Sequence, residues 1–332
     1  MDLLTLDFLG KPLWSWALFL CLVVALLVFD LGVLHRKSHE IGVRESLLLS
    51  AFYVSIGVLF SLWIWQFMGE RAALLYLTGF VVEKSLAMDN IFVIAMIFAY
   101  FGVPRAYQHR VLVYGILGVI VLRGIMIGVG AAVVERFEWV LLIFAAFLIF
   151  TGIKMLRDGD AEYDVAHNPV LRLMRRRFNV TDGLHGERFF VRQPVGASGT
   201  TALFVTPLFL ALVMVEIADV IFAVDSIPAI FAITTDPYIV YTSNIFAILG
   251  LRALYFALSA MMHRFVYLKT AVSLVLVFIG AKVIGAELLG IEKVPAAISL
   301  GVTATLLIGG IALSLWQTRK AEPVPANPVL PE

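Results

Sequence analysis

Apolar runs long enough to cross a lipid bilayer recur along almost the whole sequence. The hydrocarbon core of a bilayer is about 30 Å thick, so a spanning helix needs about 20 predominantly apolar residues. Hydrophobic residues make up 61% of the 332 residues and charged residues only 15%, whereas about a quarter of the residues of a soluble protein are charged. We therefore expect an all-α polytopic membrane protein with about nine transmembrane helices. The predicted spans are residues 13–34, 46–69, 73–101, 111–134, 138–156, 202–233, 239–262, 267–289 and 295–316.

Lysine and arginine are unevenly distributed over the connections between these spans. Sixteen fall on one side of the predicted membrane and four on the other, and basic residues are retained on the cytoplasmic side. The N-terminus is therefore expected outside and the C-terminus in the cytoplasm. The first residues lack the basic stretch of a signal peptide, so the first apolar run is expected to remain as an anchor. The single cysteine, Cys21, excludes an internal disulfide framework and a cysteine-based metal cluster.

Charged residues inside the apolar runs occur twice in the same order. In the first half "EKSLAMDNIF" is followed by "LRGIMI" and "FTGIKM"; in the second half "DVIFAVDSIP" is followed by "LRALYF" and "FIGAKV". Each set belongs to three spans, and an odd number of spans reverses the direction of the chain. The sequence therefore predicts two inverted three-helix repeats, an arrangement in which secondary transporters hold substrate near the bilayer midplane. The alignment places Glu83 over Asp219, Arg123 over Arg252 and Lys154 over Lys282.

The first helix of each repeat is longer than a bilayer requires, and its two acids are six residues apart. Six residues at 100° each place Glu83 and Asp89 about 240° apart on an unbroken helix. The same spacing separates Asp219 from Asp225. Local unwinding would bring the acids together and free backbone carbonyls as ligands, and Pro228 supports such a break in the second repeat. We therefore expect both helices to be interrupted near their acids.

The embedded charges point to a cation site. A charge at mid-bilayer depth costs at least about 2.5 to 3.5 kcal/mol on insertion scales, so such residues indicate function. The acids and their neighbours offer only oxygen ligands, which suit Mg²⁺, Ca²⁺ and Mn²⁺ better than Zn²⁺ or Cu²⁺. We expect the embedded bases to neutralise the empty site, and at least one pair to open when a cation binds. The expected metal ligands are Glu83, Asp89, Asn90, Glu216, Asp219, Asp225 and Ser226, and the charge-balancing residues are Lys84, Arg123, Lys154, Arg252 and Lys282.

Other readings of the charged residues remain open. The embedded acids and bases are nearly balanced in number, as in structural ion pairs, although buried pairs are poor stabilisers after desolvation. Asp30, near the cytoplasmic end of the first span, is either an access-path residue or a snorkelling acid that pairs with Arg36. His35 and His39 are spaced to share a helix face as ligands, but the charged residues beside them favour a solvated juxtamembrane segment.

The segment 157–199 differs from the rest of the chain in composition. Its run "RLMRRRF" marks the predicted cytoplasmic face, and "RFNVTDG" and "ERFFVRQ" around Gly183 and Gly186 predict a small β-hairpin. The proline-rich tail is expected to be disordered. The predicted organisation is 1–45, first span and cytoplasmic loop; 46–156, four spans containing the first repeat (73–156); 157–199, basic cytoplasmic loop; 200–290, second repeat; 291–320, last span; and 321–332, tail.

Four long stretches closely resemble one family of membrane proteins. They read "FDLGVLHRKSHEIGVRESL", "EKSLAMDNIFV", "YQHRVLVYGILGVIVLR" and "TPLFLALVMVEIADVIFAVDSIPAIFAITTDPYIVYTSNIFAILGLRALYF". They resemble the TerC family of tellurium-resistance-associated membrane proteins, including its Alx branch, which is placed near the lysine-exporter superfamily. The resemblance covers about residues 10–316. It implies Mn²⁺ export from the bacterial cytoplasm across the inner membrane, with the acids of the two motifs as the metal site.

Two function classes follow from these observations. The first is a secondary exporter of divalent cations that works by alternating access, with Mn²⁺ as the bound and transported ion and no resident cofactor. The second is a non-transporting membrane subunit, or a metal or pH sensor, that acts through protein partners the sequence does not identify. The lipid bilayer is the expected environment, and no nucleic acid partner is expected. An enzyme is not expected, because the sequence has no nucleophile and base arrangement, phosphate loop or cofactor fingerprint.

Overall fold

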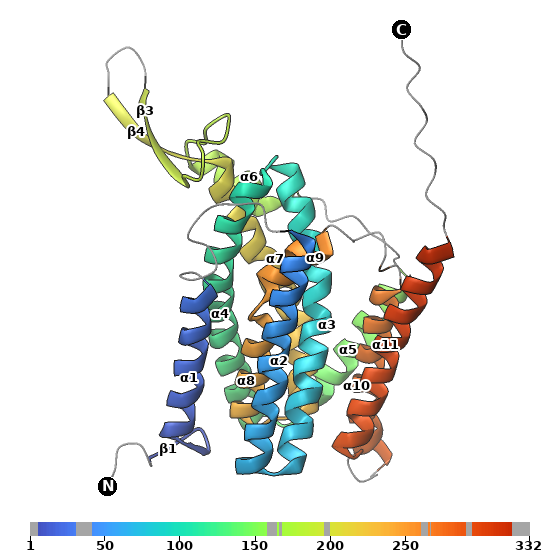
Figure 1. The fold of residues 1–332 in the computed structure, drawn as a ribbon. Coiled ribbons are helices and arrows are strands. Elements are labelled where there is room, and N and C mark those ends of the chain that lie inside the picture. The colour runs from blue at the N-terminus through green and yellow to red at the C-terminus, as the bar shows by residue number, and fades with distance from the viewer. Residues whose placement is uncertain are drawn as a thin grey trace.

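The structure is a computed structural model that describes residues 6–30, 42–157, 165, 168–195, 200–259, 265, 267–289 and 294–320. The side chain of Asp89, an expected ligand, lies outside this description, as do His35, His39 and the tail. The elements, labelled in Figure 1, are β1 (Asp7–Phe8), β2 (Lys11–Pro12), α1 (Leu13–Val28), α2 (Val43–Met68), α3 (Glu70–Tyr100), α4 (Arg105–Arg136), α5 (Val140–Arg157), α6 (Pro169–Arg177), β3 (Phe190–Val195), β4 (Thr200–Val205), α7 (Pro207–Ile233), α8 (Pro237–Ile248), α9 (Leu251–Ser259), α10 (Leu268–Leu289) and α11 (Ala296–Lys320).

The described helices confirm a polytopic all-α membrane protein. Six of them are long and apolar enough to cross a membrane, namely α2, α4, α5, α7, α10 and α11. A seventh span arises if α8 and α9, which are bent by 42° at a short break, are counted together. α1 is described over only 16 residues, and α3 contains several charged residues. The count of nine spans therefore stays a prediction.

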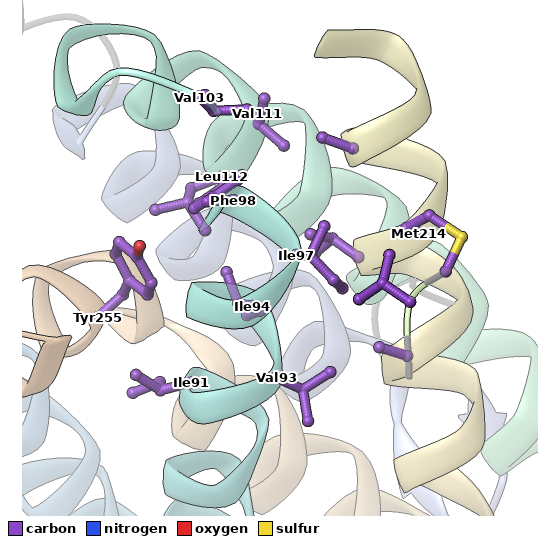
Figure 2. Close-up of a cluster of buried hydrophobic side chains, with 14 of the residues drawn as sticks. Ile91, Val93, Ile94, Ile97, Phe98, Val103, Val111, Leu112, Met214 and Tyr255 are labelled. Carbon is purple, nitrogen blue, oxygen red and sulfur yellow. The ribbon is translucent and has the colours of Figure 1, made fainter. Parts of the chain in front are cut away.

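α3 lies at the centre of the bundle, where it packs against α2, α7, α8 and α11 (Figure 1). Its second half is lined with buried apolar side chains, and Figure 2 shows Ile91, Ile94, Ile97 and Phe98 following one another along this helix. Leu112 of α4 lies beside Phe98 in the same cluster. A helix that is apolar on most of its surface is buried, so the few polar groups of α3 are held away from lipid.

The expected breaks in the two acid-bearing helices are wrong. α3 runs without interruption over 31 residues and α7 over 27 residues, even though α7 contains Pro228. Residues around Pro228 are buried on all sides, and this packing retains the helix although the proline removes one backbone donor. The break lies instead at Gly250, between α8 and α9, where φ is 79°. A Cβ at this position would lie 2.6 Å from Cβ of Tyr53, so the turn requires glycine.

The polar segment between α5 and α7 forms a hairpin, but with different partners from those predicted. β3 contains part of "ERFFVRQ" and pairs in antiparallel fashion with β4, from Phe190 opposite Val205 to Val195 opposite Thr200. The segment "RFNV" also joins β4, through a parallel bridge between Val180 and Val205. β4 occupies the beginning of the expected span 202–233, so that the helix begins only at Pro207. A proline is favoured at the first helical position because its missing N–H has no partner there in any case.

α5 and α10 pack through a reciprocal contact between two glycines. A Cβ at Gly152 of α5 would lie 2.8 Å from the carbonyl oxygen of Ser273, and a Cβ at Gly280 of α10 would lie 2.5 Å from that of Ala145. Ser273 and Ala145 each precede the glycine of their own helix by seven residues. Both backbones therefore approach closely at two matched points, as small residues permit between membrane helices.

Candidate cation site

Arg123 of α4 is buried at the centre of the candidate site, with only 1% of its surface exposed. Its guanidinium group makes two hydrogen bonds to the Asp219 carboxylate, from Nε to Oδ2 at 3.1 Å and from Nη2 to Oδ1 at 3.0 Å. Nη1 forms an ion pair with Glu83. One guanidinium thus joins acids from α3 and α7, and bidentate pairing of this kind fixes the geometry of the carboxylate as well as its charge.

Two neutral oxygens complete the surroundings of Arg123. Nη1 also donates to Oγ of Ser226 at 3.3 Å and to Oδ1 of Asn244 at 3.4 Å. Asn244 belongs to α8, so four helices meet at this one side chain. Asn244 was missing from the expected site. Asn244 is fully buried, and the available signal in the sequence was an amide within a predicted span, since a buried amide requires hydrogen-bond partners.

A small cavity lies on one side of this network. It has a volume of about 20 Å³, which is room for about one water molecule, and Asn90 and Asp219 lie in its wall. Asn90 donates from Nδ2 to Oδ1 of Asp219 at 3.3 Å. Within the described ranges, Oδ1 of Asn90 is buried and has no hydrogen-bond partner. A buried acceptor without a partner is unfavourable by about 1 to 3 kcal/mol, so this oxygen is suited to a ligand.

Glu216 brings a second unpartnered oxygen to the same region. Its Oε2 is buried without a hydrogen-bond partner among the described residues, and its carboxylate interacts electrostatically with Asp219. The carboxylate lies against Gly118 of α4, where a Cβ would stand 2.3 Å from Oε1. Gly118 thus provides the space for the Glu216 carboxylate. Sequence reasoning missed this glycine, because glycine is frequent in membrane helices and its spacing alone does not mark a site.

Asp225 lies apart from the other expected ligands, which corrects the prediction of a single cage. Its carboxylate interacts with the Thr151 hydroxyl and with Lys154, both on α5. Because α7 is continuous, the six-residue step from Asp219 turns Asp225 onto another face of the helix. Among the described residues, no group of three or more His, Cys, Asp or Glu side chains is arranged to hold a metal ion. The structure therefore brings together Glu83, Asn90, Glu216, Asp219 and Ser226, around Arg123 rather than around an open cage.

The other embedded bases have different partners. Lys84 was expected to neutralise an acid, but its Nζ donates to the backbone carbonyls of Ala247 at 2.9 Å and Leu249 at 3.3 Å. These carbonyls lie at the break between α8 and α9, where helical partners are lost. Lys282 donates to Oγ of Ser299 at 3.3 Å. Both interactions are structural contacts between helices, whereas Lys154 interacts with Asp225 and Arg123 contacts Glu83, Asp219 and Ser226.

Arg252, which the sequence alignment pairs with Arg123, lies in a separate cluster. Its Nη2 pairs with Oδ1 of Asp30 at 2.5 Å, and its Nη1 lies 2.9 Å from Nδ1 of His109. The structure therefore gives Asp30 a buried partner on α9, whereas Arg36 lies outside the described residues and the access-path role stays a prediction. His109 was not singled out by the sequence, where it adjoins Arg110 in a polar connection.

Comparison with known proteins identifies similar chains. The family model of the TerC family, described as integral membrane proteins, matches residues 68–322. A protein of Rickettsia bellii named as an uncharacterized membrane protein is 46% identical over 301 residues, which are 91% of this chain and 97% of the relative. Alx of Salmonella typhi, named as a proposed membrane-bound redox modulator, is 45% identical over 316 residues, with 92% and 95% covered. An uncharacterized membrane protein of Myxococcus xanthus is 44% identical over 317 residues, with 96% of each chain covered. No solved structure matched the chain.

Proposed function

This chain belongs to the TerC family of integral membrane proteins, and we propose from that premise that it exports divalent metal cations, with Mn²⁺ as the favoured ion. The single observation that carries the proposal is the pair of unpartnered buried oxygens on two neighbours of Asp219, namely Oδ1 of Asn90, a residue that lines the cavity, and Oε2 of Glu216. Both oxygens lie next to Asp219, through a hydrogen bond from Asn90 and an electrostatic contact from Glu216. Oxygen ligands from carboxylates and amides suit Mn²⁺, Mg²⁺ and Ca²⁺.

The charge of the site favours a cation. Glu83, Asp219 and Glu216 are three carboxyl groups near one guanidinium group, that of Arg123. Arg123 acts in this proposal as a tethered cation that occupies the acids while no metal is bound. A metal ion that enters the cavity competes with Arg123 for Asp219, and the guanidinium must then move. Buried charges left without a partner are unstable, so binding is coupled to rearrangement of α4 against α3 and α7.

An inverted-repeat architecture accounts for several packing relations at once. α3, α4 and α5 form the first repeat; α7, the α8–α9 pair and α10 form the second. α3 packs on α8 while its counterpart α7 packs on α4. The contact of Gly152 with α10 is matched by that of Gly280 with α5. These reciprocal contacts support the two inverted repeats, with nine spans, the N-terminus outside and alternating access to the site between the repeats.

The redox description of some relatives fits a metal transporter better than thiol chemistry. The sequence contains one cysteine, Cys21, which lies exposed on α1. A dithiol and disulfide couple needs two thiols, so the chain by itself does not supply one. Under the proposed function, any redox effect of this protein arises from the amount of redox-active metal in the cell.

The proposal is tested by Mn²⁺ flux into sealed liposomes that contain the purified protein and a trapped indicator. The isosteric variants Glu216→Gln and Asp219→Asn are expected to lower the rate at least about tenfold, since each removes a charged ligand. Glu70→Gln, at the exposed start of α3, is the matched control and keeps the native rate. Transport that is unchanged in both site variants would falsify the assignment.

Asp225→Asn distinguishes a compact site from the larger cage. A site confined to the residues around Arg123 predicts a smaller loss of flux for this variant than for Asp219→Asn. An equal loss indicates that Asp225 joins the site in another conformation. If Mn²⁺ binds to the intact protein, with binding lost in Asp219→Asn, but no divalent cation crosses the membrane, the second function class applies: the site then belongs to a sensor or to a non-transporting subunit.

A further inference from the structure

The cavity beside Asp219 lies between two buried arginine clusters. Along α4, its wall is formed by Leu112, Gly115, Ile116 and Val119. Arg123 follows about one turn after Val119, and His109 precedes Leu112 by about one turn, because an α-helix has 3.6 residues per turn. Leu251 of α9 also lines the cavity, and the next residue is Arg252. The lining residues of α4 therefore fall between His109 and Arg123 in the sequence, and the lining residue of α9 adjoins Arg252.

The Arg252 cluster joins three parts of the chain that are far apart in sequence. Arg252 on α9 bonds to the carboxylate of Asp30, just beyond the end of α1, at 2.5 Å, and also to the Asp30 carbonyl oxygen at 3.3 Å. Its other nitrogen, Nη1, lies 2.9 Å from Nδ1 of His109 on α4. Arg252 is 2% exposed and Asp30 is 8% exposed. These contacts close the bundle at the end where α4 begins.

We propose that Arg252, Asp30 and His109 form a gate that closes the cavity at the end where α4 begins, and that the gate stays closed only while His109 is uncharged. This inference rests on the proposed transport function, because a gate is needed only if the cavity opens to that side. The two arginine clusters then have different roles in alternating access. Arg123 occupies the cation site itself, and Arg252 controls one entrance to it.

The hydrogen-bonding capacity of the partners determines the charge of His109. A guanidinium group has five N–H donors and no acceptor, so a ring nitrogen of His109 must accept the hydrogen bond from Arg252, either Nδ1 at 2.9 Å or Nε2 at 3.4 Å. A protonated imidazole has donors on both nitrogens and cannot accept it. Protonation would also place a second positive charge 2.9 Å from Nη1 of Arg252. The charged form of His109 therefore opposes the closed arrangement by both hydrogen bonding and repulsion.

The surroundings of His109 leave it as the switching group. Tyr53 of α2 faces the Asp30 carboxylate and interacts with it electrostatically. Arg252 on α9 contacts His109 directly. The other charged and titratable groups of the neighbouring segments are Asp30 beyond α1, Tyr53 on α2, Tyr255 on α9, Arg105 and Arg110 on α4 itself, and Glu187, which pairs with Arg110. Of these groups, histidine has the side chain that ordinarily changes charge between about pH 5 and 8.

The break between α8 and α9, next to Arg252, provides a hinge for the gate. Gly250 separates α8 from α9 with its positive φ, and Lys84 holds the α8 side of the break through the carbonyls of Ala247 and Leu249. α8 is thereby fixed to α3, whereas α9 carries Arg252 and begins just after the glycine. A few residues at the ends of elements are the usual hinges of domain and gate motions. Rotation of α9 at Gly250 would withdraw Arg252 from both of its partners.

Access to a reporter cysteine in the cavity wall tests this gate without knowledge of the transported ion. Leu112→Cys supplies the reporter, and Cys21→Ser removes the native thiol. A membrane-impermeant maleimide is applied to each face of sealed vesicles in turn. Arg252→Met is expected to raise the labelling rate of Cys at 112 at least about tenfold, as expected for the loss of one charge-assisted hydrogen bond, and only from the face at which α4 begins. An equal rise from both faces indicates general loosening, and no rise indicates no gate; either result overturns the proposal.

The role of His109 is tested by two replacements of opposite character. His109→Gln keeps an acceptor that does not titrate, and is expected to hold the labelling rate low from about pH 8 to about pH 5. His109→Lys is charged and has no acceptor, and is expected to raise the rate about tenfold at all these pH values. With His109 present, the rate should rise as the pH falls. A native protein whose labelling is independent of pH, or a Gln variant that still responds to pH, shows that His109 is not the switch. Labelling that follows the prediction while Mn²⁺ flux is absent retains the gate and rejects the proposed function.

Discussion

Arg123 and Arg252 occupy equivalent positions in the two halves of the sequence but have different surroundings. Arg123 contacts two carboxylates, one hydroxyl and one amide, all from side chains. Within the described part of the chain, Arg252 contacts the carboxylate and the backbone carbonyl of Asp30 and the imidazole of His109. The acids around Arg123 outnumber it, whereas Arg252 and Asp30 balance in charge. Under the two proposals, the excess of acid around Arg123 attracts an added cation and the pair of Arg252 and Asp30 closes a passage, so two positions that align in the sequence would serve different purposes.

The largest expected effect is the loss of Arg123. Arg123→Met leaves Glu83 and Asp219 without their shared partner, and breaking a buried pair in this way destabilises by about 3 to 5 kcal/mol. Arg252→Met uncovers only one carboxylate and is expected to lower the free energy of unfolding by less. Chemical unfolding of the purified variants in detergent measures both. An equal loss in the free energy of unfolding for Arg252→Met and Arg123→Met would contradict the difference drawn between the two arginines.

A second substitution separates charge from volume in the Arg123 network. The double variant Arg123→Met with Glu83→Gln is expected to be more stable than Arg123→Met alone, because one uncompensated charge has been removed. If the double variant is less stable than Arg123→Met, packing of the guanidinium outweighs its charge, and the electrostatic account of this network is wrong.

Gly250→Ala tests the break that carries Arg252. Alanine at φ 79° is strained, and its Cβ would overlap Cβ of Tyr53 at 2.6 Å. We expect a loss of about 2 to 4 kcal/mol in the free energy of unfolding from these two causes together. Gly285→Ala on α10, where a Cβ meets nothing within 4 Å, is the control and should change little. Similar unfolding curves for both variants would show that the break tolerates a side chain.

Gly118→Ala tests the position of the Glu216 carboxylate and its role as a metal ligand. Its Cβ would stand 2.3 Å from Oε1 of Glu216, so the carboxylate must shift, with a loss of about 1 to 3 kcal/mol in the free energy of unfolding. Gly124→Ala, on the same helix with free space around it, is the matched control. We expect Mn²⁺ binding, measured by calorimetry, to weaken about tenfold in the first variant only. Equal binding by the two variants argues against Glu216 as a ligand.

The smallest effects are expected at the two lysines that contact neutral oxygens. Lys84→Met leaves two carbonyls at the α8–α9 break without a donor, which is unfavourable by about 1 to 3 kcal/mol. Lys282→Met removes a single bond to the Ser299 hydroxyl, worth about 0.5 to 1.5 kcal/mol. The midpoint temperatures of thermal unfolding show which of the two variants, Lys84→Met or Lys282→Met, is less stable. A larger shift for Lys282→Met would mean that the break is stabilised by other contacts than Lys84.

Much of the architecture could be predicted from the sequence because the bilayer imposes simple rules on it. Apolar runs of sufficient length indicate helices, and the embedded charges identified Glu83, Asp219 and Arg123, which the structure joins. Those residues stand out because a charge in hydrocarbon is rare and needs a partner. The count of nine spans and the ligand role of these acids remain predictions.

Other features depended on tertiary packing that no local pattern specifies. Pro228 suggested a break, but buried neighbours hold α7 together. The real break at Gly250 is set by contact with Tyr53, which is nearly 200 residues away in sequence. Asp225 carries the same motif as the central acids, yet an unbroken helix turns it toward α5. The sequence placed acids on helices correctly and could not tell which face each would occupy.

The matched contacts of Gly152 and Gly280 have the form of an interface between two copies of one surface. In such an isologous contact, residue i of one partner touches residue j of the other and the reverse also holds. Here both contact surfaces belong to one chain, on α5 and α10. The glycine of each helix lies against a backbone carbonyl of the other. A protein that contained only one of these halves would already carry the surface needed to pair with a copy of itself inserted upside down in the same membrane.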